Sequence, residues 1–133
     1  MPPSSELLFV AGGGALGSLI RYGLSLLSLR FFGGTTLVGT FVANLVGCFA
    51  IGLLTAILVA HPDWLAPRTI IGLRVGLLGG LTTFSTFAAE SVLLAGQARF
   101  GGMTLYVTST VVLGILAVYA GTWIAGAPQE SAR

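Results

Sequence analysis

Four long apolar segments occupy almost all of the 133-residue chain, at about residues 7–32, 36–60, 68–95 and 104–125. A helix needs roughly 20 mostly apolar residues to cross the hydrocarbon core of a bilayer, and each segment is long enough to do so. We therefore predict an all-α integral membrane protein in which residues 1–133 form one domain of four transmembrane helices. The first segment lacks a charged leader and a clear cleavage site, so we expect a retained span rather than a signal peptide.

The composition excludes several other classes of protein. Only 8% of the residues are charged and 55% are hydrophobic, whereas about a quarter of a soluble domain is charged. The net charge of +2 comes from scattered arginines without any lysine, which gives no basic patch for nucleic acid. The single cysteine, Cys48, excludes a disulfide framework. The polar residues 128–133 are expected to be disordered.

The arginines are divided almost equally between the two ends of the predicted spans. An even number of spans joined by short turns puts both termini on one side. That side collects Arg68, Arg133 and, depending on depth, Arg74, and the other collects Arg30 and Arg99. Orientation follows the difference in Lys and Arg between the two sides. Because the difference is about one residue, we predict that the chain inserts in both orientations.

Small residues recur every four positions in three of the segments. Such stripes let helix backbones approach closely in lipid. They serve either packing within the chain or a subunit interface, and the sequence leaves both open. The stripes are Gly13 and Gly17; Gly39, Ala43 and Gly47; and Gly72, Gly76 and Gly80.

Residues 79–90, GGLTTFSTFAAE, interrupt the third segment with glycine and hydroxyl side chains. Glycine lowers helix propensity, and serine and threonine compete for backbone hydrogen bonds. We predict a helix break here, which frees carbonyls that attract a cation and N–H groups that attract an anion. Non-helical backbone at membrane depth must be buried or line a water-filled path, so the break predicts a functional site.

Asn44, Phe84 and Phe87 each have two open interpretations. Asn44 in the second segment either ties helices together or donates to a permeating anion. Phe84 and Phe87 share a helix face and are either apolar bulk or ring edges that carry positive potential toward an anion. Thr86 and Glu90 form a neighbouring polar stripe.

Further polar residues lie in the first and fourth segments. Tyr106, Thr108, Ser109 and Thr110 form a second hydroxyl cluster, which is either satisfied by its own helix or part of a polar path. Arg21 either reaches the interface or pairs with a carboxylate, and Glu90 is a candidate partner that alternatively lines a vestibule. No metalloprotease, Ser/His/Asp or phosphate-loop motif is found in the sequence, so an enzyme is not predicted.

Three stretches, GGGALGSLIRY, GTFVANLVGCFAIG and GLLGGLTTFSTFAAE, together resemble the Fluc (CrcB) family of fluoride channels. The resemblance implies an antiparallel, dual-topology homodimer in a membrane, the bacterial inner membrane in particular. It also implies two fluoride pores and a structural Na⁺ between the subunits, held by backbone carbonyls. The implied pore residues are Asn44, Phe84, Ser85, Thr86, Phe87, Tyr106 and Thr110; the sodium ligands are Gly79 and Thr82; and Arg21 and Glu90 lie in a vestibule or salt bridge. Gly114 stands where some members have a hydroxyl residue.

The resemblance implies passive export of cytoplasmic fluoride and fluoride resistance. Two other classes compete with it. A proton-coupled multidrug exporter needs an ionisable carboxylate deep in a span, and Glu6 and Glu90 both lie near span ends. A non-transporting assembly subunit leaves the polar third segment without a role. Fluoride flux through the purified protein separates the three.

Overall fold

The computed structural model describes residues 4–126, and within them four helical segments are long and apolar enough to cross a membrane. Three of the segments are single helices, namely α1 (Ser4–Phe31), α2 (Leu37–Ala60) and α6 (Phe100–Ile124). The third runs from Pro67 to Gly96 in four pieces: α3 (Pro67–Ile71), the π-helix η1 (Gly72–Leu78), α4 (Gly79–Leu81) and α5 (Phe84–Gly96). The four-span, all-α prediction is confirmed. The disorder predicted for residues 128–133 falls outside the described residues.

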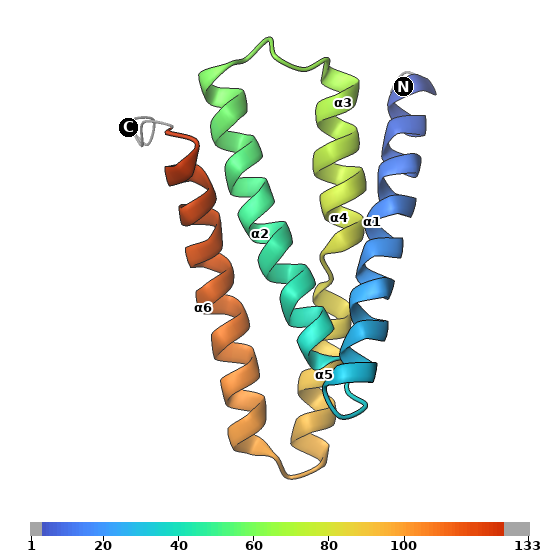
Figure 1. Cartoon of the computed structure of the whole chain (residues 1–133), viewed down its shortest axis with the longest axis vertical. Coiled ribbons are helices and arrows are strands. Elements are labelled where there is room, and N and C mark those ends of the chain that lie inside the picture. The colour runs from blue at the N-terminus through green and yellow to red at the C-terminus, as the bar shows by residue number, and fades with distance from the viewer. Residues whose placement is uncertain (1–3, 127–133) are drawn as a thin grey trace.

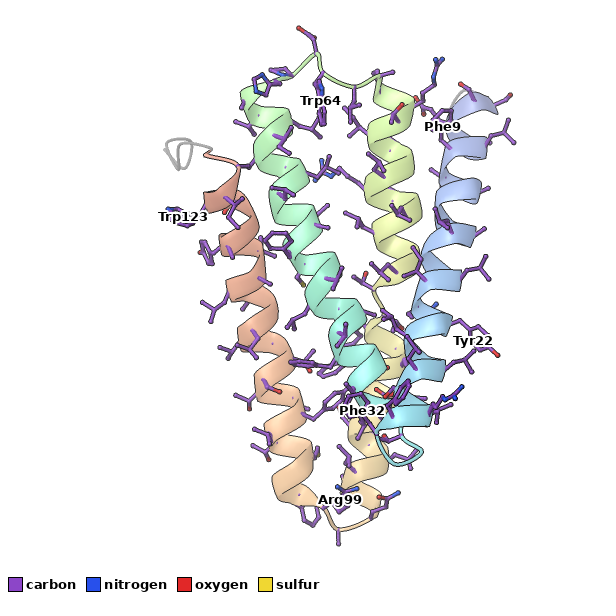
Figure 2. All side chains as sticks on the ribbon, viewed as in Figure 1. Phe9, Tyr22, Phe32, Trp64, Arg99 and Trp123 are labelled. Atoms are coloured by element: carbon purple, nitrogen blue, oxygen red, sulfur yellow. The ribbon has the colours of Figure 1, made fainter. Side chains whose placement is uncertain are left out.

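The spans lie side by side with α2 at the centre of the view (Figure 1). α2 packs along α6, and α1 packs along η1 and α4. The start of α1 and the end of α6 lie at the same end of the molecule, as an even number of spans requires. Trp64 and Trp123 lie toward that end and Arg99 at the other (Figure 2). Aromatic and cationic residues are enriched at membrane interfaces, so these positions fit the two ends of the spans.

Two span boundaries differ by more than one residue from the sequence-based prediction. α6 begins at Phe100 rather than near Thr104, so the polar turn before it is shorter than expected. Gly101 and Gly102 favour a loop by propensity, but they are helical here because Ala98, at φ +57°, already completes the turn. α1 begins at Ser4, three residues earlier than predicted.

The glycine stripes pack within the chain. A β-carbon added at Gly13 would overlap the carbonyl of Gly72, and one at Gly17 would overlap the carbonyl of Leu77. In the second stripe, Gly39 lies against the backbone of Leu24 and Gly47 against the methyl group of Thr82. Close backbone approach between these helices therefore depends on glycine, and the packing interpretation of the stripes is confirmed.

The third span is interrupted at Thr82 and Thr83, whose backbones are extended at φ −79°, ψ 152° and φ −149°, ψ 118°. The predicted break is confirmed, but it follows the glycine pair instead of including it. Gly80 stays helical because it packs against the backbone of Gly14. The preceding π-helix was not predicted, since no side-chain pattern in residues 72–78 marks it.

Candidate functional site

A cavity of about 490 Å³ opens between α2, α6 and the broken third span, and the break lies in its wall. Most of its lining is apolar, with a few polar groups. Six residues predicted for the site lie on it, namely Asn44, Gly79, Thr82, Phe84, Phe87 and Thr110. Gly47, Cys48, Ile51, Arg74, Leu78, Thr83, Val111, Gly114, Ile115 and Val118 complete the lining.

Asn44 holds the break by pairing with the backbone of Thr83. Its Oδ1 accepts the Thr83 N–H at 2.8 Å, and its Nδ2 donates to the Thr83 carbonyl at 3.2 Å. An asparagine amide has two N–H donors, so one remains beside the cavity after this pairing. The two interpretations of Asn44 are therefore compatible, because the residue that ties the helices together still offers a donor.

Thr83 caps the N-terminus of α5. Its Oγ1 accepts the N–H of Thr86 at 3.2 Å and donates to the Thr86 hydroxyl at 3.1 Å. The Ser85 hydroxyl lies 3.2 Å from the same oxygen. Ser85 and Thr86 are absent from the lining of the 490 Å³ cavity, so the structure places these predicted pore residues around the cap instead.

Phe84, Phe87 and Tyr106 form a row of rings. The centroids of Phe84 and Phe87 are 5.9 Å apart, and those of Phe87 and Tyr106 are 5.4 Å apart, with tilted planes in both pairs. In a tilted pair the positive edge of one ring approaches the negative face of its partner. Phe84 is 80% exposed in the single chain, whereas Phe87 is 8% exposed. Removing the Phe84 ring therefore costs the fold far less than removing that of Phe87.

Glu90 is buried among hydroxyl groups. Its Oε2 accepts from the Tyr106 hydroxyl at 2.6 Å, and its Oε1 accepts from Thr36 and from Thr40, the latter at 3.0 Å. These three donors offset much of the cost of burying a carboxylate. The Tyr106 hydroxyl is thus directed at Glu90, and the Thr110 hydroxyl at the carbonyl of Tyr106 at 2.7 Å.

Arg21 and Glu90 do not pair, which corrects one of the two suggestions made from the sequence. The Arg21 Nε donates to the carbonyl of Gly80 at 3.1 Å, in the last turn before the break. Glu90 instead borders a second cavity of about 300 Å³ that also contacts Gly34 and Arg99. The sequence alone could not decide this, because several acceptors compete for Arg21 and several donors compete for Glu90.

The carbonyls of Gly79 and Thr82 lose the donors that a continuous helix would give them. The N–H groups four residues on belong to Thr83 and Thr86, and these bond to Asn44 and to the Thr83 hydroxyl. Unpaired carbonyls at membrane depth cost several kcal/mol each. Oxygen atoms of this kind are ligands for a small hard cation. The carbonyl oxygens of Gly79 and Thr82 are therefore chemically suitable ligands for Na⁺.

Thr40 and Thr83 were not assigned roles from the sequence. Thr40 is 1% exposed and bonds to Glu90. Its position four residues before Asn44, on the same helix face, was the available signal. Thr83 precedes α5 with Thr86 three positions later, which is the spacing of an N-cap.

Comparison with known protein families identifies the family of this chain. A family model described as CrcB-like protein, Camphor Resistance (CrcB), matches residues 8–122. The chain belongs to the CrcB family. CrcB relatives include a fluoride-specific ion channel FluC of Caulobacter sp. (strain K31), 40% identical over 91% of this chain and 94% of the relative. FluC 1 of Staphylococcus epidermidis is 44% identical over 91% of this chain and 97% of the relative.

These CrcB relatives are named as ion channels, not enzymes. The match to the family model covers most of α1 and α6, all of α2, and the third span on both sides of the break. Every residue of the 490 Å³ cavity lies inside it. The similarity therefore extends to the whole candidate site.

Proposed function

We propose that this chain forms a passive, fluoride-selective channel that exports cytoplasmic fluoride and confers fluoride resistance. The observation that carries the proposal is the cavity wall that joins the Asn44 amide to the two phenylalanine rings at a helix break. Relatives of nearly the same length, named fluoride-specific ion channels, support it.

Fluoride holds its hydration water tightly, so a pore must replace that water with several modest donors. The second N–H of Asn44 and the ring edges of Phe84 and Phe87 are donors of this kind. None of them carries a net charge. Fluoride is therefore bound strongly enough to enter and weakly enough to leave, as conduction requires.

The physiological role follows from acid–base chemistry. Hydrogen fluoride is a weak acid that crosses a membrane as a neutral molecule and dissociates in the cytoplasm. The anion cannot return through lipid. A fluoride-selective pore in the cell membrane lets the negative interior potential drive it out. On this basis, and because the relatives come from bacteria, we propose that the protein lies in a bacterial inner membrane.

Fluoride efflux from liposomes tests the function. Liposomes loaded with potassium fluoride and chloride, in sodium-containing buffer, are treated with valinomycin, and a fluoride electrode follows release. We expect rapid fluoride release, little chloride release and no requirement for a pH gradient. Release that depends on a proton gradient would instead favour an exchanger, and no release would contradict a channel.

We further propose that two antiparallel copies form the channel. The two ends of the described spans carry similar positive charge, with Arg68 at the start of α3 at one end, and Arg30 in the last turn of α1 and Arg99 before α6 at the other. Orientation is decided by such charges, so neither direction of insertion is strongly favoured.

Paired lysine variants test dual topology. Gly33 and Gly34 have positive φ and are left unchanged. Lysines replace Phe32 and Gln97 at one end, or His61 and Asp63 at the other, all exposed turn positions. Each variant alone should insert one way and lose flux, whereas co-expression of the two should restore it. A reporter after residue 133 that finds one orientation for the unmodified chain would contradict this proposal.

A structural Na⁺ between the two copies completes the proposed channel. The carbonyls of Gly79 and Thr82 from each copy would hold it, because their helical donors are diverted to other acceptors. The ion offsets the cost of buried, unpaired oxygens and is not transported.

Removing sodium is expected to abolish most fluoride flux, and adding it back should restore flux. Potassium replaces sodium through purification and reconstitution, and the dimer content is followed by gel filtration in detergent. Sodium should raise flux in a saturable way without any sodium current. Equal flux from sodium-free and sodium-loaded protein would rule out the site without affecting the fluoride assignment.

A further inference from the structure

Arg74 is a charged residue inside a span, on the wall of the same cavity as Asn44 and Phe84. It lies in η1, seven residues after the start of the third span at Pro67, which is about 10 Å along the helix axis. Its side chain is exposed in the single chain. The position therefore combines a full positive charge with the cavity proposed to admit fluoride.

An arginine at this depth needs water or a partner. Arg21, the other arginine well inside a span, donates to the carbonyl of Gly80. For Arg74, no side-chain hydrogen bond or ion pair is found within residues 4–126. Charged residues in spans usually face a water-filled cavity, and the alternative is that the long side chain reaches the membrane interface. The cavity beside Arg74 supplies the water-filled environment.

The helix geometry directs this position toward the cavity. Arg74, Leu78 and Thr82 lie on the lining four residues apart, the spacing of one helix face, and Gly79 lies on it next to Leu78. The Gly79 N–H bonds to the Arg74 carbonyl, five residues back, as well as to that of Gly76. Single π-turns occur frequently at functional sites. Here the π-turn joins the arginine to the glycine that precedes the break.

We propose that the Arg74 guanidinium faces the aqueous mouth of the cavity and concentrates small inorganic anions there, fluoride among them. This inference rests on the proposed channel function. Asn44 and the rings are uncharged, so they act only over short distances. A cation at the mouth acts at longer range and raises the local anion concentration, which increases the rate of entry.

The effect should depend on ionic strength. The Debye length is about 30 Å at 0.01 M and about 10 Å at 0.1 M, so salt should screen Arg74 progressively. Fluoride flux is measured at low fluoride in sodium buffer, with and without the sodium salt of a large impermeant organic anion. Arg74→Gln removes the charge and Arg74→Lys retains it.

Arg68→Gln is the matched control. Arg68 lies six residues away on the same span, with its guanidinium carbon 5.9 Å from the centre of the Phe9 ring, and it is absent from the cavity lining. The Arg68→Gln substitution removes the same charge as Arg74→Gln, from the same half of the third span.

We expect Arg74→Gln to lower flux roughly threefold to tenfold at low ionic strength, with the deficit shrinking toward none when salt is added. Arg74→Lys should retain most of the flux, and Arg68→Gln should resemble the parent. A deficit that salt does not change, an equal deficit in Arg74→Lys, or an equal deficit in Arg68→Gln would overturn the inference. An unmodified protein without flux would instead reject the channel function itself.

Discussion

Asn44→Asp is expected to reduce fluoride flux about 100-fold. The new carboxylate still accepts the Thr83 N–H but loses the donor that Nδ2 gives to the Thr83 carbonyl. It also places a negative charge on the cavity wall. Two like charges about 6 Å apart repel by about 2.8 kcal/mol at an effective dielectric constant of about 20, and about 2.8 kcal/mol corresponds to about 100-fold. Fluoride efflux from liposomes measures the change.

Gln97→Glu is the control for this substitution. It makes the same amide-to-carboxylate change in the exposed turn before α6, away from the 490 Å³ cavity. Flux should stay within about twofold of the parent. If the two variants lose flux equally, the Asn44 effect reflects net charge and not the site. If Asn44→Asp conducts normally, Asn44 has no part in the ion path.

Phe84→Ile is expected to reduce flux at least tenfold while leaving the protein's thermal stability nearly unchanged. The ring is 80% exposed in the single chain, so little packing within the chain is lost. Isoleucine keeps an apolar side chain and removes the positive ring edge. A tenfold loss corresponds to about 1.4 kcal/mol. Flux and the midpoint of thermal unfolding are measured on the same preparation.

Phe87→Ile should lose at least as much flux and also some stability, because Phe87 is buried and its ring packs against Tyr106. Phe9→Ile is the control, since Phe9 is a half-exposed phenylalanine of α1 outside the cavity lining. If all three substitutions reduced flux equally, the rings would serve packing alone. Near-parental flux in both Phe84→Ile and Phe87→Ile would remove them from the mechanism.

The fold was largely predictable because membrane spans depend on length and apolar content alone. Errors arose where propensity competes with packing. Gly80 remains helical because the backbone of Gly14 lies against it. Gly101 is helical for a different reason, since the turn already ends at Ala98. Neither feature is visible in the local sequence. The π-turn in residues 72–78 likewise left no pattern in the side chains.

The site was predictable in its residue types and less so in its partners. Asn44 and the two phenylalanines do share a cavity. Glu90, however, is held by the hydroxyls of Thr36, Thr40 and Tyr106, and Arg21 bonds to a backbone carbonyl. Choosing among several nearby acceptors requires the three-dimensional arrangement of the helices. Backbone carbonyls in particular cannot be singled out from the sequence, because every residue has one.

The central claim is selective, passive conduction of fluoride, and the reversal potential of the current tests it most directly. The protein is placed in a planar bilayer with sodium buffer, equal high chloride on both sides and a tenfold fluoride gradient. A fluoride-selective channel should reverse near the fluoride equilibrium potential, about 59 mV for a tenfold gradient of a monovalent ion. A current that reverses near zero, where chloride is at equilibrium, would contradict the account.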